Sequence, residues 1–462
     1  MEIKDYMTQF IEDYYREDHN YEEMPAIQLV EQNTFVELSN LDFPEEGKPV
    51  EEMIDVLRHK VYPNRSVGEH PRNFAFIPAP IEEVSKLGDL VNLFYNPNAC
   101  GWYPSSGTAS IEHALINWLC EQAGYSEESS GIFVSGGSSA NLTAAIAARD
   151  SKLKADDINK GIAYISNQAH HSVNKALHVI GIPEERIRRL KTDENLKIIP
   201  EDLTTQVNKD LANGLKPFLI IGTAGTTNAG VIDPLKELAE LAEEYNLWLH
   251  IDGAFGASLL LSNENRHLVD GLELADSITW DAHKWLFQTY SCAMLLVKNR
   301  SSLLHSFSDQ PEYLDDAHQA DRTDFWDLGI ELSRPARGVK LWLTIQTLGT
   351  KKIGEQIDYG IELAEYTEVQ VKKANHWQIV TPAQTAIINF RYFDDKHTEE
   401  ELNAINTMLS EKMTSTGYAQ VLTTKLNGVT VLRMCTLSPL TKHQDIEKTI
   451  NDLNQIVLDQ VK

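Results

Sequence analysis

Lys284 is the residue whose neighbours in the sequence most favour covalent chemistry. It lies in the segment TWDAHKWLF, residues 279–287, where large apolar aromatic residues surround it. Burial beside such residues disfavours the ammonium form and lowers the pKa of the amine, and a neutral lysine forms a Schiff base with an aldehyde. The alternative is that the aliphatic stem lies along the aromatic rings while the ammonium reaches water. The segment alone leaves both interpretations open.

A glycine- and serine-rich turn, SGGSSAN at residues 135–141, follows an apolar strand candidate and begins an alanine-rich helix at residues 142–149. Glycine lets the backbone approach a ligand closely, and the free amides at a helix N-terminus favour an anion, so the turn indicates a phosphate site. It matches neither the Walker loop nor the dinucleotide-binding fingerprint. An ordinary serine-capped helix start would explain the same residues without a ligand.

Two further polar residues follow apolar strand candidates. Asp252 comes after residues 247–251 and could hold a heteroaromatic nitrogen in its protonated form, or be an ordinary loop carboxylate. His170, in the segment QAHHS at residues 168–172, could stack on a flat ring or transfer protons. Because adjacent histidines point in different directions, His170 and His171 are a poor metal pair. Thr226 and Thr227 add hydroxyl groups after residues 218–223.

Short apolar segments alternate with helical ones between residues 131 and 298, which predicts βα units and a mainly parallel sheet. The strand candidates are residues 131–134, 163–166, 218–223, 247–251, 277–279 and 293–297. Since chemistry in such sheets gathers at the carboxyl ends of the strands, we expect the glycine turn, His170, Asp252 and Lys284 to meet. The ligand that suits all four is a planar phosphorylated aldehyde with a ring nitrogen, pyridoxal phosphate.

The rest of the chain predicts two flanking parts. The spacing of apolar residues predicts amphipathic helices at about residues 1–15 and 50–61, in a segment too thin in core residues to fold alone. Residues 308–323 are polar, acidic and aperiodic, which predicts a mobile lid. An α+β pattern ends the chain. The expected domains are an N-terminal helical segment at 1–84, a large α/β domain at 85–354 and a small α+β domain at 355–462.

The composition excludes several classes of protein. The 462-residue chain has a formal net charge of −27, which would repel nucleic-acid phosphates and anionic membranes. Its four cysteines form no CxxC pair, which favours a reducing compartment over a disulfide scaffold or a zinc site. Residues 1–20 lack the apolar core of a signal peptide, and no apolar run is long enough to span a bilayer. We therefore expect a cytoplasmic protein with neither nucleic-acid nor membrane partners.

Over essentially its whole length the chain resembles the group II pyridoxal-phosphate decarboxylases, and most closely the aromatic-L-amino-acid decarboxylases. The matching segments, in order, are His70-Pro71 with Phe74 and Pro78, Gly136-Gly137-Ser138, Gln168-Ala169-His170, Gly225-Thr226-Thr227, His250-Ile251-Asp252-Gly253-Ala254, His283-Lys284-Trp285 and Pro311-Glu312-Tyr313-Leu314. The resemblance implies the aspartate-aminotransferase-like fold (fold type I of pyridoxal-phosphate enzymes), with a mainly parallel seven-stranded sheet. It also implies a homodimer whose N-terminal segments wrap around the partner.

The resemblance assigns roles to individual residues. Lys284 would bind the cofactor as a Schiff base, His170 would stack on its ring, and Asp252 would pair with the ring nitrogen. Tyr313 would protonate the carbon that loses carbon dioxide. Asp281 stands where several members of the family have asparagine, and a phosphate would repel a carboxylate there. The residues implied to contact the cofactor are Gly137, Ser138, His170, Thr227, Asp252, Ala254, Asp281, His283 and Lys284.

The resemblance also implies a substrate pocket that includes Phe76, Ala79 and Cys100, with Arg433 near the substrate carboxylate. The part expected to hold the side chain has no cationic residue, which favours an aromatic amino acid over glutamate, because a second buried carboxylate without a partner is costly. We expect tryptophan, tyrosine, phenylalanine or dihydroxyphenylalanine to be converted to its amine and carbon dioxide. The alternatives are a decarboxylase of acidic amino acids, a carbon–sulfur lyase and a regulatory binder of pyridoxal phosphate. The lyase is disfavoured because the loop carries Tyr313 and no cysteine.

Overall fold

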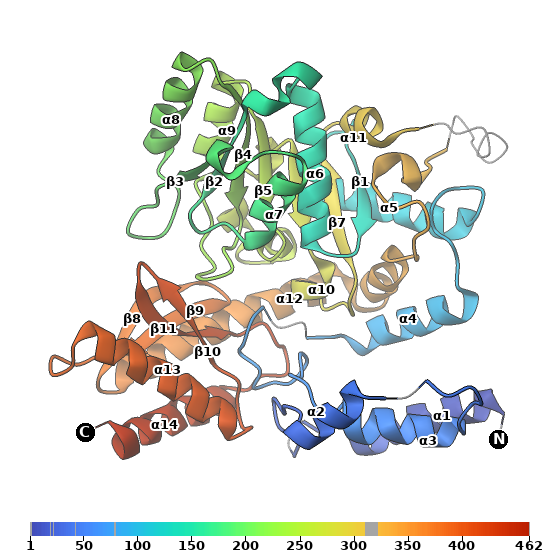
Figure 1. Ribbon diagram of the computed structural model, residues 1–462, viewed down its shortest axis with the longest axis vertical. Helices are drawn as coiled ribbons and strands as arrows, with labels where there is room; N and C mark the ends of the chain where they lie inside the picture. The colour runs from blue at the N-terminus through green and yellow to red at the C-terminus, as the bar shows by residue number, and fades with distance from the viewer. Residues whose placement is uncertain are drawn as a thin grey trace. The chain divides into compact units, whose positions relative to one another are not determined.

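The computed structural model describes residues 2–18, 20–21, 23–41, 43–77, 80–309 and 322–461 of the chain (Figure 1). The chain forms two compact units. The first comprises residues 1–78, 366–380 and 390–462, and the second comprises residues 79–365 and 381–389. The glycine turn, His170, Asp252 and Lys284 all belong to the second unit.

A seven-stranded sheet forms the centre of the second unit. Its strands are β1 (Ser130–Val134), β2 (Gly161–Ser166), β3 (Ile187–Leu190), β4 (Lys216–Thr223), β5 (Trp248–Asp252), β6 (Ser277–Trp280) and β7 (Ala293–Val297). They are arranged in the order β1-β7-β6-β5-β4-β2-β3. The pairs from β6 to β3 are parallel, whereas β7 is antiparallel to both of its neighbours. The predicted α/β fold with a mainly parallel seven-stranded sheet is therefore confirmed.

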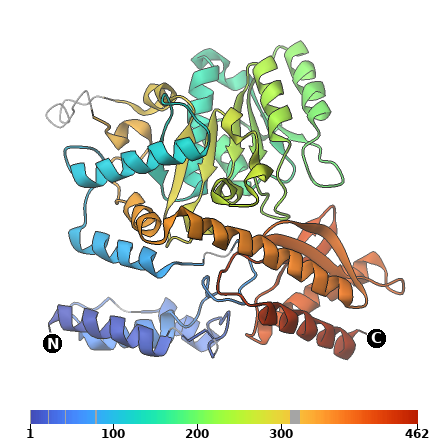
Figure 2. The same ribbon diagram turned by 180° about the vertical axis from the view of Figure 1, so that it is seen from behind.

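Helices pack on both faces of this sheet. Helices α6 (Gly137–Lys152) and α7 (His171–Val179) lie in front of it in Figure 1, and α5 (Ser106–Gln122) lies in front of it when seen from behind in Figure 2. The sequence of α6 is rich in alanine, and Ala140, Ala144, Ala147 and Ala148 are fully buried. Their small side chains let the helix lie close to the strands, so α6 contacts β1, β4, β5, β6 and β7.

The other helices of the second unit include one short helix that carries the lysine. They are α4 (Glu83–Tyr95), α8 (Pro200–Ala212), α9 (Leu235–Glu244), α10 (Ala282–Trp285), α11 (Arg300–Phe307) and the first part of α12 (Gly338–Lys373). Helix α10 follows β6 directly and presents Lys284 at the end of that strand. Helix α12 is interrupted at Gly349, whose φ of +77° favours glycine.

The first unit contains helices from both ends of the chain. They are α1 (Ile3–Asp13), α2 (Gln32–Ser39), α3 (Val50–Val56), α13 (Glu399–Ser415) and α14 (His443–Gln460). The π-helical turns Tyr14–Asp18 and Leu57–Val61 extend α1 and α3. A second, four-stranded sheet has the order β10-β11-β9-β8, and residues 381–389, at the adjoining ends of β8 and β9, are assigned to the second unit. Its strands are β8 (Trp377–Thr385), β9 (Ile387–Tyr392), β10 (Leu422–Leu426) and β11 (Val429–Cys435).

The N-terminal helices bury few of their own side chains. Among the described residues of α1 only Asp13 is buried, and α2 and α3 bury none. Large apolar side chains therefore remain exposed within this segment, among them Leu29 (74%) and Phe43 (98%). Among the described residues, no helix is both long and apolar enough to cross a membrane.

Candidate active site

The nine residues that the sequence predicted to contact a cofactor all line one cavity in the second unit, with a volume of about 300 Å³. Its walls come from residues at or just after the ends of β1, β2, β4, β5 and β6, because the carboxyl ends of these strands lie at one edge of the sheet. The roles assigned to the nine residues remain predictions. The lining residues are Ser135, Gly136, Gly137, Ser138, Asn141, His170, Ser172, Thr223, Gly225, Thr227, Asp252, Ala254, Phe255, Asp281, His283, Lys284 and Tyr290.

Lys284 is held by a carboxylate within its own helical turn. Its Nζ lies 3.1 Å from Oδ2 of Asp281. Burial acts to lower the pKa of Lys284, but the carboxylates of Asp281 and Asp252 outweigh it, and the pKa is raised above its usual 10.5. The sequence prediction of a lowered pKa is therefore wrong. It considered the aromatic neighbours of the lysine and neglected these two carboxylates.

Asp281 lies between the lysine and the glycine turn, with only 2% of its surface exposed. Its Oδ1 has no hydrogen-bond partner among the described residues. A Cβ atom at Gly137 would lie 2.9 Å from Oδ2 of Asp281, so glycine is required for the backbone to come this close. The N-terminus of α6 favours a negative charge at this place. In this structure the charged partner of Asp281 is Lys284.

The start of α6 supplies donors at the wall of the cavity. Its first helical residues, Gly137 and Ser138, are in the first turn, whose backbone amides have no partner within the helix and attract anions. Pyridoxal phosphate fits this set of residues. The helix start matches the phosphate, Lys284 matches the aldehyde, and Asp252 matches a protonated ring nitrogen. The buried Oδ1 of Asp281 has no hydrogen-bond donor among the described residues, so a bound ligand could supply one here.

Asp252 ends β5 and is held from two sides. Its Oδ2 accepts a hydrogen bond from Nδ2 of Asn141 at 2.9 Å, and its Oδ1 accepts one from the backbone amide of Ala254 at 3.2 Å. Carboxylate oxygens have further lone pairs, so Asp252 can accept another donor from the cavity. Sequence reasoning missed Asn141. The available signal was its position four residues after Gly137, which places it on the same face of a helix.

His170 precedes α7 and caps it. Its Nδ1 accepts a hydrogen bond from the backbone amide of Ser172 at 3.3 Å and lies 2.8 Å from the Ser172 hydroxyl. Burial lowers the pKa of His170, against the opposing effect of the Asp252 carboxylate. The imidazole is thereby kept neutral, which suits a ring that stacks on another ring. The described residues contain no group of three or more side chains placed to hold a metal ion.

The residues predicted for the substrate pocket are divided between the two units. Cys100 is buried in the second unit, and burial raises the pKa of its thiol. Phe76 and Arg433 belong to the first unit, where Nη1 of Arg433 donates to the carbonyl oxygen of Phe76 at 2.5 Å. Arg433 is buried, and its Nε and Nη2 have no partner among the described residues. Ala79 and Tyr313 lie outside the described residues.

Tyr290 also lines the cavity, although the sequence analysis did not single it out. Its ring centroid lies 5.0 Å from that of His283. Its carbonyl oxygen accepts a hydrogen bond from Nζ of the buried Lys340 at 3.0 Å, which holds the backbone here. No motif marks this residue, because it is placed by a tertiary contact with α12.

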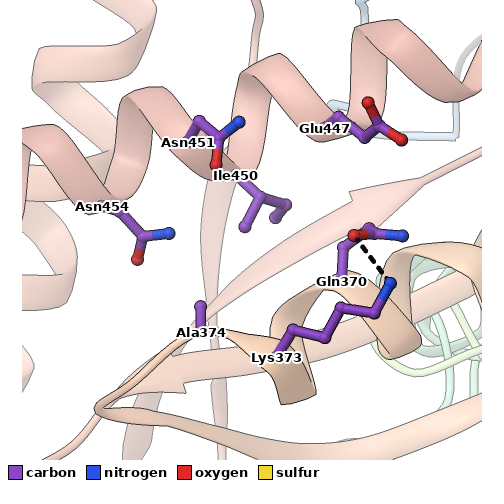
Figure 3. A pocket seen from close by; sticks show the side chains of 7 residues that line it. All are labelled: Gln370, Lys373, Ala374, Glu447, Ile450, Asn451 and Asn454. Carbon is purple, nitrogen blue, oxygen red and sulfur yellow. Dashed lines mark hydrogen bonds between the residues drawn. The ribbon is translucent and has the colours of Figure 1, made fainter.

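A second hollow lies in the first unit, between side chains of α12 and α14 (Figure 3). Its only drawn hydrogen bond joins Nζ of Lys373 to Oε1 of Gln370 at 3.5 Å. Amide groups and one acid dominate its wall, and its lining contains no histidine, cysteine or hydroxyl group. Lys373 is the one nucleophile in this lining, and the lining has no counterpart of the glycine turn or of His170 in the cavity of the second unit. The lining residues are Gln370, Lys373, Ala374, Glu447, Ile450, Asn451 and Asn454.

Comparison with known proteins identifies relatives of the whole chain. The family model described as "Pyridoxal-dependent decarboxylase conserved domain" matches residues 33–393. An aromatic-L-amino-acid decarboxylase from Bacillus atrophaeus is 38% identical over 406 residues, which cover 87% of this chain and 84% of that protein. Tryptophan decarboxylase 2 from Oryza sativa subsp. japonica is 30% identical, covering 96% of this chain and 91% of that protein.

Solved structures share the same fold. The crystal structure of Oryza sativa TDC with PLP and tryptamine has a TM-score of 0.93 and 27% sequence identity, covering 99% of this chain and 97% of that chain. Catharanthus roseus tryptophan decarboxylase in complex with L-tryptophan has a TM-score of 0.91 and 27% identity, and the match covers 99% of both chains.

Proposed function

The chain belongs to the pyridoxal-dependent decarboxylase family, and from this premise we propose that it converts aromatic L-amino acids to the corresponding amines and carbon dioxide. The predicted family, the cofactor pyridoxal phosphate and the reaction class of a carboxy-lyase are confirmed by this membership. The observation that carries the proposal is the convergence of Lys284, Asp252, His170 and the start of α6 on one cavity.

We assign the steps of the reaction to these residues. Bound pyridoxal phosphate supplies the electron sink for the pair of electrons released when the bond to the carboxylate breaks. Backbone amides at Gly137 and Ser138 would hold the phosphate, and His170 would lie on the ring. Asp252 would keep the proton on the ring nitrogen, which makes the sink effective. Lys284 must lose a proton before it can form the Schiff base, and the Asp281 carboxylate, 3.1 Å from its Nζ, stabilises the ammonium form that must be lost.

We propose by resemblance that Tyr313 returns a proton to the carbon that has lost carbon dioxide. A Tyr313→Phe variant should bind pyridoxal phosphate normally and lose amine formation. Amine release by that variant at the wild-type rate would remove Tyr313 from the mechanism.

The aromatic substrate class rests on the relatives and on the predicted pocket. The curated relatives include tyrosine and tryptophan decarboxylases. Cys100 is a small residue of the predicted pocket, and the Nε and Nη2 atoms of Arg433, which have no partner among the described residues, would bind the substrate carboxylate. Decarboxylation of an acidic amino acid is the second candidate, because the same chemistry serves it and Arg433 is a buried cation.

The test of the function is product analysis by mass spectrometry. Purified protein loaded with pyridoxal phosphate is incubated with a mixed panel of amino acids, and the amines formed are identified and ranked. Tryptamine, tyramine or phenethylamine would support the proposal. Formation of 4-aminobutyrate alone would overturn the substrate class, and the absence of any amine would overturn decarboxylation in favour of a lyase or a regulatory binder.

We also propose that the protein is a cytoplasmic homodimer in which residues 1–84 cover the partner. The apolar side chains left exposed in the N-terminal segment, both on its helices and at Leu29 and Phe43 between them, favour this arrangement, because a monomer would leave them in water. The four cysteines are all free and buried, which suits a reducing compartment. Sedimentation should give twice the chain mass, and replacement of both Leu29 and Phe43 by serine should shift the protein towards the monomer. A wild-type protein that sediments as a monomer would contradict the proposal.

A further inference from the structure

Asn141 lies at a junction of buried polar groups beneath the cavity. It is on α6, with 2% of its surface exposed. Its Nδ2 donates to Oδ2 of Asp252 at 2.9 Å and to the hydroxyl of Ser172 at 3.1 Å. Its Oδ1 accepts a hydrogen bond from the hydroxyl of Thr279 at 2.7 Å. Since a carboxylate can only accept, the amide nitrogen must face Asp252 and the amide oxygen must face the other way.

The oxygen of Asn141 fixes the proton of a second histidine. Nε2 of His250 lies 3.0 Å from Oδ1 of Asn141, so this nitrogen must carry the hydrogen. Burial lowers the pKa of His250 to about 4, so the ring is neutral and its Nδ1 is an acceptor. Nδ1 lies 2.8 Å from the hydroxyl of Ser277, which in turn accepts a hydrogen bond from Nε1 of Trp248 at 2.8 Å. Every donor on this side therefore has an acceptor.

The nitrogen of Asn141 fixes the proton of the cavity histidine. Because the Ser172 oxygen accepts from Asn141, its own hydrogen is free to point to Nδ1 of His170 at 2.8 Å. The backbone amide of Ser172 donates to the same Nδ1. With two donors aimed at Nδ1, a neutral His170 must carry its proton on Nε2.

We propose that Asn141 is a positioning residue that joins Asp252 and His170 in one hydrogen-bond chain of fixed direction. The chain runs from Trp248 on β5 through His250 to Asn141 and there divides between the two cavity residues. One branch orients the Asp252 carboxylate. The other branch sets which nitrogen of His170 carries the proton. This proposal deepens the proposed function, because it explains how the groups expected around the cofactor ring are set before the cofactor binds.

The geometry separates this role from simple core packing. A residue that only filled space could be replaced by an apolar one of similar size without altering the protonation of either branch. Among the described residues of α6, only this amide donates to both Asp252 and Ser172, and both of its polar atoms are used. Its loss would leave the Asp252 carboxylate with the Ala254 amide as its one remaining donor in the described part of the chain.

The test compares two variants and a matched control in the full-length protein. Asn141→Leu keeps the size and removes both branches. Ser172→Ala removes only the hydroxyl that links Asn141 to His170. Asn174→Leu makes the same substitution on α7, at a half-buried asparagine that donates to Glu184 at 3.0 Å and accepts from Arg189 at 3.0 Å. Circular dichroism establishes that each variant folds.

Two quantities are measured. NMR of protein labelled in the histidine ring nitrogens gives the position of the His170 proton without added cofactor, with His170→Gln identifying the signal. Titration of the cofactor-free protein with pyridoxal phosphate gives its affinity, and the absorption spectrum reports the protonation of the bound ring.

The expected pattern is specific to the branched chain. Asn141→Leu should move the His170 proton from Nε2 towards a mixture of both nitrogens and weaken pyridoxal-phosphate binding by about 10–100-fold, the loss expected for a hydrogen bond to a charged group. Ser172→Ala removes the hydroxyl, which is the nearer of the two donors to Nδ1 of His170, and keeps the backbone amide at 3.3 Å, so it should shift the His170 proton partly towards Nδ1. It should change the affinity less than about threefold, because the Asp252 branch is intact. Asn174→Leu should change neither.

Either of two results would overturn the proposal. One is an Asn141→Leu protein that folds and retains both the wild-type His170 proton position and the wild-type affinity. The other is a Ser172→Ala protein with an unchanged His170 proton, which decides the question if Asn141→Leu does not fold. The His170 measurement needs no cofactor, so a wild-type protein that failed to bind pyridoxal phosphate would count against the proposed function and leave this test standing.

Discussion

The two ends of the cavity differ in how completely their polar groups are bonded by the protein itself. At one end, both oxygens of Asp252 accept hydrogen bonds, and the donor Asn141 is bonded through both of its own polar atoms. At the other end, Asp281 pairs with Lys284 through one oxygen, while its other oxygen is buried without a partner among the described residues.

This difference indicates that the two ends meet a cofactor in different ways. The Asp252 end is already arranged for a protonated ring nitrogen, so binding there requires little rearrangement. The Asp281 end holds a carboxylate and an ammonium that must exchange a proton before Lys284 can react with an aldehyde. The first end is built by folding alone, and the second is completed by the ligand.

The largest expected effect is at the Asp281 end of the cavity, where Lys284 reacts with the cofactor. Lys284→Ala removes the amine that forms the Schiff base, and amine formation from the preferred amino acid should fall at least about 10⁴-fold, as for other covalent catalytic groups. Borohydride reduction followed by peptide mass analysis should attach the cofactor to the Lys284 peptide of the wild type and to no peptide of the variant. Labelling of a different lysine in the wild type would contradict the assignment.

At the Asp252 end, the substitution Asp252→Asn keeps the shape of the side chain and removes its charge. The ring nitrogen would lose the carboxylate that holds its proton, so kcat should fall by about 10²–10³-fold, a loss typical of a removed electrostatic stabiliser. The kcat for amine formation is measured with saturating cofactor and substrate. A kcat within about threefold of wild type would show that the Asp252 end does not control the electron sink.

His250, which is buried behind Asp252, should make the free energy of unfolding of the protein depend on pH. Burial lowers the pKa of His250 to about 4, so below its usual 6.5 the unfolded chain binds more protons than the folded protein, and stability falls as pH falls. Between about pH 7 and pH 5 this histidine should remove about 2 kcal/mol from the free energy of unfolding. His250→Gln keeps a donor towards Asn141 without titrating there. Urea denaturation of the variant should show a correspondingly weaker pH dependence, and an identical dependence would exclude His250 as its source.

The smallest expected effect concerns the rate at which the cofactor is captured. Asp281→Asn removes the nearer of the two carboxylates that raise the pKa of Lys284, so burial should then lower that pKa and more of the amine should be neutral. Schiff-base formation by the cofactor-free variant, followed by stopped-flow absorbance, should be faster near pH 7, because a larger fraction of the amine is neutral. A slower capture would mean that Asp281 assists the cofactor rather than retaining the proton of Lys284.

Much of the cavity could be predicted from the sequence because its residues follow directly after strands. A strand of continuous apolar residues with a polar residue at its end is visible in one segment, and parallel pairing then brings such ends together, as for Asp252 and Lys284. The sequence analysis did not predict the small elements α2, β3 and β10, because such elements lack the continuous apolar pattern of a core strand or helix. Helix α2 buries no side chain, and β3 includes Arg188 and Arg189, so neither has the apolar pattern of a core element.

What the sequence could not predict depends on contacts between segments. The hydrogen-bond partners of Asn141 come from β5, β6 and α7, and no spacing within α6 indicates them. The raised pKa of Lys284 required weighing burial against Asp252, a carboxylate from another strand. Tyr290 enters the cavity wall through a loop whose carbonyl is held by Lys340. In each case the chemistry is set by distances that only the folded chain defines.

The most direct test of the difference between the two ends is a pair of crystal structures, one of the cofactor-free protein and one with pyridoxal phosphate bound. We predict that Asn141 and Asp252 keep their hydrogen bond of 2.9 Å in both, whereas the 3.1 Å pair between Lys284 and Asp281 is broken when Lys284 bonds to the cofactor. A cofactor-free structure in which Asn141 and Asp252 are apart, and come together only on binding, would contradict the account.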